Sequence, residues 1–376
     1  MGGKGSLTLF HVRGLPVRVH YTFLIILPYL AWIIGRSAPL LAQLAGVEVA
    51  DLVLPRYVLG TVLALGLFAC VLVHEFAHIG VGIKGGGQFS GVTLMLVGGV
   101  SEVVELPKRP VWELAMAIAG PLASVLLAVI GFAAFGLFAM PPDLRFGVFY
   151  LAYVNFALAL FNLVPAFPMD GGRILRSVLS MLTNRVRATR IAAVTGQIFA
   201  GLFLLAGIYT LNWVLLLIGA LVIVGARAEL EMAKVGALFD GLTVAQAMQP
   251  FVPTVDENDR VSAVLERMAR ELKTTFFITR DGQVVGAITA VEARRLDERG
   301  DGTLRVGEAA KREVPLLSPD QELGKASRIL RTSGLSALPV MRDGALVGQL
   351  TLAAMAAAVR ERDAHKLVAL RDRKAT

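Results

Sequence analysis

The sequence predicts a polytopic α-helical membrane protein of about six spans, with a short membrane-associated β-hairpin, followed by an α/β domain that contains a tandem repeat. Hydrophobic residues make up 55% of the 376 residues and charged residues only 18%, against roughly 25% charged in soluble proteins. Of the Asp, Glu, Lys and Arg residues, 22 lie in residues 1–226 and 44 in the shorter remainder, which also holds the repeat. These differences predict two parts that fold in different solvents.

Six apolar segments are near the length of about twenty residues that a helix needs to cross a bilayer. They are residues 20–34 or 20–46, 57–80, 111–138, 146–165, 191–210 and 211–226. No small-residue cleavage site follows the first segment, so we expect a retained span rather than a signal peptide. The last two segments run together, and Tyr209, Asn212 and Trp213 predict a tight interfacial turn between them.

Basic residues gather beside alternate ends of these segments. They are Lys4, Arg13 and Arg18; Lys84, Lys108 and Arg109; and Arg173, Arg176, Arg185, Arg187 and Arg190. With an even number of spans, the positive-inside rule places both termini, and with them the C-terminal domain, in the cytoplasm. The net charge of +8 includes no long basic tract, so we expect no nucleic-acid partner.

The second predicted span contains the pattern His74-Glu75-Phe76-Ala77-His78. Residues four apart share one face of a helix, so the two imidazoles can hold one zinc ion while Glu75 takes a proton from the attacking water. Two buried histidines beside an ion-paired glutamate are the alternative without a metal. Because three ionisable groups are costly in an apolar span, we favour the metal site.

Two histidines leave a zinc site incomplete, and Asp170 is the acidic residue that fits the missing position. It follows the fourth span, which Pro165 and Pro168 should end. Asp is also a favoured helix N-cap, and its type alone supports both roles equally. Depth favours the ligand: if the second span enters near Tyr57, His74 lies about 26 Å along it, close to the cytoplasmic end where Asp170 also falls.

The two motifs together resemble the site-2 protease family of intramembrane zinc metalloproteases. One is His-Glu-x-x-His at 74–78, and the other is Asn-x-x-Pro-x-x-Pro-x-Asp-Gly-Gly at 162–172. The resemblance extends over most of residues 1–226. Both motifs fall at predicted membrane positions.

This resemblance implies a role for each matching residue. His74, His78 and Asp170 would hold one Zn²⁺ per chain, and Glu75 would act as the general base. Asn162 would lie near the site, where it would steady the developing oxyanion or the substrate backbone. An interhelical hydrogen bond is an equally supported role for Asn162.

Between the second and third spans, Val92–Glu105 is typical of two short strands joined by Gly98-Gly99. A helical substrate hides its peptide bonds, so cleavage requires local unwinding. An exposed strand edge at Gly98, Gly99 and Val100 would hold the unwound segment by adding it as a strand. The hairpin also resembles the Gly-Gly element of the family. A purely structural hairpin packed under the spans is equally supported.

Two other features of the spans favour packing roles. Ala119-Gly120-Pro121 in the middle of the third span predicts close helix contact or a kink, and the family carries a similar motif there. Cys70, the single cysteine, lies one turn before His74 and is interpreted as a small apolar residue of a packed span.

The charged part contains an internal repeat, since Asp281–Thr289 recurs 62 residues later as Asp343–Thr351. A helical stretch and a strand precede each copy. The pair resembles tandem cystathionine β-synthase-type (CBS) modules. We therefore expect a metalloprotease domain at 1–226, a linker at 227–239, CBS repeats at 240–300 and 303–362, and a charged tail at 363–376.

CBS pairs often bind adenine nucleotides such as ATP or AMP in the cleft between repeats. In ligand-binding copies an Asp that reaches the ribose commonly follows the strand-ending Gly-x-x-Thr. Here Thr289 is followed by Glu292, whereas Thr351 is followed by Ala354. Thr289, Glu292 and Thr351 are the candidate nucleotide contacts, and a dimerisation or substrate-docking role for the pair is equally supported.

The sequence thus predicts an intramembrane zinc endopeptidase of the cell membrane, regulated through its CBS pair. Its substrate would be a transmembrane protein cleaved within or next to a span in the lipid bilayer. A CBS-regulated transporter or channel, and a catalytically silent nucleotide-sensing receptor, are the alternatives from other classes. The ionisable groups form a hydrolytic constellation rather than a relay across the bilayer, which favours the protease.

Overall fold

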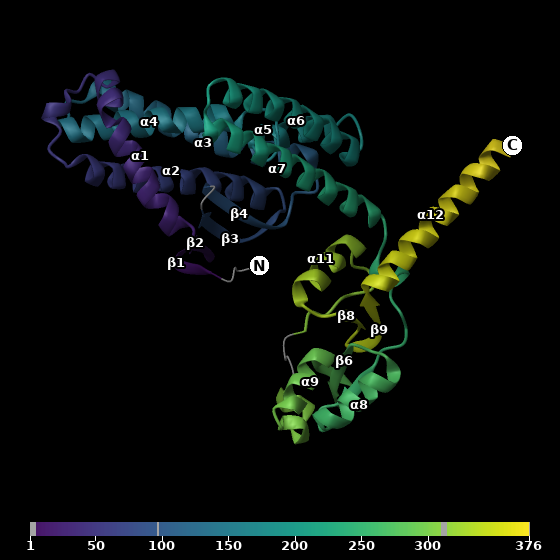
Figure 1. Ribbon diagram of the computed structural model, residues 1–376. Helices are drawn as coiled ribbons and strands as arrows, with labels where there is room; N and C mark the ends of the chain where they lie inside the picture. Colours follow the sequence, from purple (N-terminus) through teal and green to yellow (C-terminus); the bar gives the residue numbers. More distant parts are fainter. Residues whose placement is uncertain (1–4, 96–97, 310–313, 376) are drawn as a thin grey trace. The chain divides into compact units, whose positions relative to one another are not determined.

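The computed structural model describes residues 5–95, 98–309 and 314–375. The chain divides into two compact units, Met1–Ala233 and Lys234–Thr376. Figure 1 shows the helical bundle that dominates the first unit and the mixed α/β elements of the second.

Six of the helices in the first unit are long and apolar enough to cross a membrane, which confirms the predicted number of spans. The helices of this unit are α1 (Phe23–Leu44), α2 (Arg56–Lys84), α3 (Pro110–Leu137), α4 (Pro142–Asn162), α5 (Asp170–Ser180), α6 (Arg185–Tyr209) and α7 (Trp213–Leu238), with a short 3-10 turn η1 (Val49–Asp51). The fifth span begins before the predicted apolar run because the Asn184 side chain caps α6 by accepting from the Arg187 N–H.

A four-stranded sheet stands where only a hairpin was predicted. Its strands are β1 (Ser6–Val12), β2 (Leu15–His20), β3 (Gln88–Met95) and β4 (Gly98–Glu105), in the order β1-β2-β3-β4. β2 pairs with β3 in parallel, and the other two pairs are antiparallel. The tight turn that joins β1 to β2 is made by Arg13 and Gly14, both with positive φ.

Gly98 and Gly99 do not form the predicted turn of the hairpin. They lie inside β4, where they pair with Met95 and Leu94 of β3. The two residues between the strands lie outside the described residues. Gly98 has φ +117, a backbone conformation that favours glycine at the start of β4. In the sequence, a Gly-Gly pair kept for this reason looks the same as a hairpin turn.

Hydrogen bonds to one carboxylate hold β4 against the rest of the sheet. Glu102 accepts from Thr93 Oγ1 at 2.7 Å, from Ser90 Oγ at 2.9 Å and from Arg18 Nη1 at 2.8 Å. Partial burial alone would raise the pKa of Glu102, but these hydrogen bonds and the nearby guanidinium lower the pKa below its ordinary value. The carboxylate therefore stays ionised and joins β2, β3 and β4.

The second unit contains the two predicted repeats. Its elements are η2 (Val244–Gln246), β5 (Thr254–Asp256), α8 (Val261–Glu271), β6 (Thr275–Arg280), β7 (Gln283–Thr289), α9 (Ala290–Glu298), η3 (Asp301–Thr303), α10 (Val306–Ala309), α11 (Leu323–Ser333), β8 (Ala337–Arg342), β9 (Ala345–Thr351) and α12 (Leu352–Ala375). They form a sheet β5-β6-β7 and a pair β8-β9. The repeated Asp-Gly dipeptides make matching turns, with positive φ at Asp281, Gly282, Asp343 and Gly344.

The segments expected as a linker and a tail are helical. Residues 227–239 continue α7 as far as Leu238, and residues 363–375 belong to α12. Both segments are rich in Ala, Leu, Glu, Lys and Arg, which are strong helix formers, so loss of apolar character did not end either helix.

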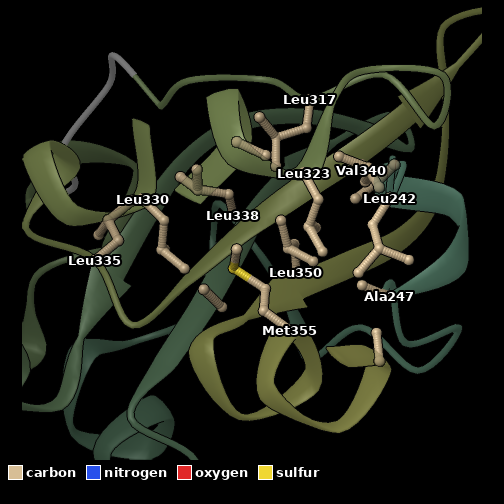
Figure 2. Close-up of a cluster of buried hydrophobic side chains, with 14 of the residues drawn as sticks. Leu242, Ala247, Leu317, Leu323, Leu330, Leu335, Leu338, Val340, Leu350 and Met355 are labelled. Atoms are coloured by element: carbon tan, nitrogen blue, oxygen red, sulfur yellow. The ribbon is translucent and has the colours of Figure 1, made fainter. Parts of the chain in front are cut away.

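One hydrophobic cluster draws on both repeats of the second unit. Phe277 and Ala287 from the first repeat belong to the same cluster as the side chains of the second repeat. Figure 2 shows Leu323, Leu338 and Leu350 lying together at its centre. The two repeats therefore share part of their hydrophobic core.

We expect Leu350→Ala to lower the free energy of unfolding of this unit by about 2–5 kcal/mol, since it leaves a cavity in the core. Leu352→Ala is the matched control, because Leu350 is 0% exposed and Leu352, two residues later, is 52% exposed. Denaturant unfolding of the two variants tests this. Equal stabilities would contradict the packing described.

Candidate metal centre

Three potential metal ligands from two distant parts of the chain meet in the first unit. His74 and His78 lie one turn apart on α2, and Asp170 is the first residue of α5. One ligand atom of each lies within 4.8 Å of the others, and all three residues are buried. The structure therefore brings together the two histidines and the aspartate that the sequence singled out separately.

Asp170 does not serve as the N-cap of α5. That position belongs to Met169, whose backbone is extended, and Asp170 is already helical. Its Oδ2 lies 3.2 Å from His74 Nε2 and 3.1 Å from His78 Nε2. Of the two roles left open by the sequence, the geometry favours the ligand.

The hydrogen bonds on the far side of the histidines indicate which ring nitrogens face the site. His78 Nδ1 donates to the Met116 carbonyl at 2.7 Å, and a carbonyl oxygen can only accept. A neutral His78 ring therefore carries its proton on Nδ1, and the lone pair of Nε2 points into the space that His78 shares with His74 and Asp170. His74 Nδ1 is hydrogen-bonded to Ser124 Oγ at 2.8 Å and likewise directs Nε2 inward.

Such an arrangement suits a cation. The two Nε2 atoms lie 3.1 Å apart, and the Asp170 oxygen is as close to each, so three electron-pair donors converge with little room between them. Two ligands of a tetrahedral zinc ion, each about 2.0–2.1 Å from the metal, are roughly 3.3 Å apart. The donor set of two imidazoles and one carboxylate, with one position left for water, is that of a catalytic zinc site.

Gly120 lets α3 approach the two histidines closely. A Cβ on this residue would come within 2.6 Å of His74 Nε2 and nearer still to His78 Nε2. Met116 and Ser124, which bind the two rings, lie one turn on either side of it on α3. α3 therefore packs against the two histidines, and the predicted close packing at Gly120 is the contact with their rings.

Glu75 is in contact with the sheet rather than with the buried ligands. Ser101 Oγ on β4 donates to Glu75 Oε2 at 2.5 Å. A Cβ on Gly99 would lie 2.8 Å from Glu75 Cγ and 2.9 Å from Val71 Cγ1, so β4 crosses directly over this part of α2. The edge strand and the candidate base are neighbours.

The structure gives other predicted residues local partners. Asn162 Nδ2 donates to the Leu158 carbonyl in its own helix at 3.1 Å. In the second unit, Glu292 Oε2 accepts from the N–H and hydroxyl of Thr289 in a capping box at the start of α9. Thr351 Oγ1 accepts from the Ala354 N–H. Glu292 and Thr351 thus serve as helix caps and Asn162 bonds within its own helix, and the functional roles of all three remain predictions.

Sequence reasoning missed Ser124, Met116 and Ser101. Met116 acts through its backbone carbonyl, which carries no sequence signal. The two serines resemble any small polar residue until the fold is known. A serine one turn beyond the Gly120-Pro121 pair was the single available hint, because small polar residues in spans are commonly hydrogen-bonded across helices.

Comparison with known proteins gives a consistent result. Residues 142–206 match peptidase family M50, and residues 244–298 and 306–361 match the CBS domain. The chain is 30% identical over 283 residues to zinc metalloprotease MJ0392 of Methanocaldococcus jannaschii, covering 75% of this chain and 78% of that protein. It is 30% identical over 368 residues to the protein Rip3 of Mycobacterium tuberculosis, covering 90% and 91%. A solved site-2 protease from Methanocaldococcus jannaschii, 31% identical, covers 60% of this chain and 95% of its own, with a TM-score of 0.43.

Helices long and apolar enough to span a membrane, together with two histidines and an aspartate that could hold a metal ion, are the features expected of a membrane-embedded metalloprotease. The chain belongs to the site-2 protease family of zinc metalloproteases, peptidase family M50, and carries a pair of CBS domains. The predicted family, fold class and enzyme class are thereby confirmed.

We expect Gly120→Ala to weaken zinc binding by at least tenfold, because the new methyl group would occupy the space beside both Nε2 atoms. Gly136→Ala is the matched control, since Gly136 lies on the same helix with nothing within 4 Å of its added Cβ. Competition with a chromophoric chelator measures both affinities. Equal affinities would contradict the close approach of α3 to the ligands.

Proposed function

We propose that this chain is an intramembrane zinc endopeptidase that cleaves peptide bonds within or next to a transmembrane segment of another membrane protein. His74, His78 and Asp170 would be the zinc ligands and Glu75 the general base. The observation that carries the proposal is the convergence of three buried donors on helices long and apolar enough to span a bilayer. Hydrolysis inside a membrane needs water and a base held away from lipid, and buried ionisable groups supply that setting.

When bound, zinc would polarise the substrate carbonyl and lower the pKa of water. Glu75 would accept the proton of the attacking water and return it to the leaving amine. The hydroxyl of Ser101 orients the Glu75 carboxylate by donating to Oε2, and the second oxygen stays available for the proton. Asn162 would steady the oxyanion or the substrate backbone from the end of α4.

The substrate segment would be held in extended form along β4. This strand forms one edge of the sheet, and Gly98, Gly99 and Val100 begin it next to Glu75. An added strand gains backbone hydrogen bonds that a helix lacks once it unwinds. The contact between Gly99 and Glu75 supports the placement, since a peptide paired with this edge would pass beside the base.

The protein would be a multi-pass protein of the cell membrane with both termini in the cytoplasm. The basic residues that flank alternate spans support this orientation. The CBS pair would then face the cytoplasm, bind an adenine nucleotide such as ATP or AMP, and regulate cleavage. A second copy of the pair could dimerise the protease. To contact a ribose, Glu292 would have to release the Thr289 N–H that it now caps.

We expect Glu75→Gln to abolish cleavage of a transmembrane reporter by the detergent-purified protein while zinc content stays near one per chain. The amide keeps the shape of the side chain but cannot take up the proton. Glu48→Gln, at an exposed glutamate before η1, is the control and should cleave as the wild type does. Cleavage by Glu75→Gln at the wild-type rate would overturn the assigned base, and absence of zinc from the folded wild-type protein would favour the transporter or receptor alternatives.

We expect Gly99→Val to reduce cleavage at least tenfold with zinc affinity unchanged, because its side chain would press on Glu75 and crowd the strand edge. Val104→Ala, at an exposed position of the same strand, is the control. The rate of reporter cleavage and the zinc affinity are measured together. Wild-type cleavage by Gly99→Val would exclude this edge as the substrate site.

A further inference from the structure

A network of four charged side chains with a buried centre lies on helices next to the metal centre. Arg176 on α5 donates through Nη2 to Glu113 Oε1 on α3 at 2.5 Å and through Nη1 to Glu229 Oε2 on α7 at 2.7 Å. Arg185 at the start of α6 pairs with the other oxygen of Glu113, with Nη1 2.9 Å from Oε2. The network therefore joins four helices and balances two positive with two negative charges.

The centre of this network is removed from solvent. Glu113 is 1% exposed and Arg176 is 3% exposed, whereas Arg185 at its rim is exposed. A buried ion pair contributes little net stability compared with apolar packing, but each charge has a strict need for its partner. A buried network of this kind therefore stabilises one relative position of the helices over others.

Two of the four helices that the network joins, α5 and α3, position the proposed metal ligands. Arg176 lies six residues after Asp170 on the same short helix. Glu113 lies one turn before Met116 on α3, the helix that orients both histidines through Met116 and Ser124. The Arg176–Glu113 pair therefore fixes α5, which carries Asp170, against α3, which binds both histidine rings.

Arg176 also holds the segment that leads into Asp170. Its guanidinium lies 5.1 Å from the centre of the Phe167 ring, and Phe167 is fully buried three residues before the ligand. Gly172 packs against the backbone of Ala166 and Phe167, so the turn before the ligand is tightly closed. Arg176 therefore lies after Asp170 on α5 and also contacts the segment that precedes Asp170.

We propose that Arg176 is a positioning residue for the metal centre: by bridging Glu113 on α3 and Glu229 on α7, it fixes the helix that carries Asp170 against the helix that orients both histidines. The proposal rests on the assignment of Asp170 as a ligand under the proposed function. Glu229 lies on α7, a helix that begins in the first unit and extends past Ala233 to Leu238.

The test measures zinc affinity of the full-length protein in detergent by chelator competition, together with the visible spectrum of the cobalt-substituted form and the thermal unfolding temperature. The variants are Arg176→Lys, the double variant Arg176→Gln with Glu113→Gln, and Glu229→Gln. The double variant removes one positive and one negative charge together, so neither of the two most buried side chains is left as a lone charge, while Glu229 and Arg185 at the rim lose these partners. Asp170→Ala serves as the reference for loss of a ligand, and Arg190→Gln, an exposed arginine of α6, as the control.

We expect the double variant to weaken zinc binding by about tenfold or more and to change the cobalt spectrum at temperatures where it is folded. Arg176→Lys should restore part of the affinity, because an ammonium keeps the charge but cannot bridge two carboxylates with a planar fork. Glu229→Gln should have a smaller effect of the same sign, since Glu229 is partly exposed. Arg190→Gln should match the wild type.

Wild-type zinc affinity and cobalt spectrum in the double variant, with or without a lower unfolding temperature, would overturn the proposal and leave the network a purely stabilising role. If the double variant does not fold, Glu229→Gln decides, and an unchanged affinity there overturns the proposal. Wild-type affinity in Asp170→Ala would instead overturn the proposed ligand set and the positioning role with it.

Discussion

The cost of placing charge in an apolar bundle is the constraint on which the membrane unit depends. In the described spans, the buried imidazole and carboxylate side chains have close partners: His74 and His78 contact Asp170, and Glu113 pairs with Arg176. Each pairing ties together segments far apart in the sequence. Because an unpaired charge is so unfavourable in this setting, these contacts determine how the helices are placed as well as what chemistry they support.

Helix α3 supplies none of the candidate ligands, yet the centre depends on it. Its small residue Gly120 admits the imidazole rings, and its Met116 carbonyl and Ser124 hydroxyl fix their orientation. Glu113 on the same helix secures α5 through Arg176. The sequence predicted close contact at Gly120 of α3, and the structure shows that α3 contacts both histidines and, through Glu113, the helix that carries Asp170.

Sequence patterns predicted the parts whose chemistry is local. The His-Glu-x-x-His spacing and the Asp170 motif are each recognised within a short stretch of sequence, and the structure brings the two together. The Asp-Gly repeat is recognised from two short stretches that match. Ser101 and Ser124 gain their roles only from tertiary contacts, and the Met116 carbonyl is common to every residue type. Strands β1 and β2 were missed because their short alternating pattern merges with the start of the first apolar run.

The parallel pairing of β2 with β3 has a consequence for how the bundle can open. β2 leads into the start of α1, and β3 follows the end of α2. The parallel pairing from Val17–Val92 to Val19–Leu94 therefore holds the start of α1 and the end of α2 together. These two helices cannot part there without breaking the ladder. Under the proposed function, a transmembrane substrate could not enter between α1 and α2 at this end while the ladder is intact.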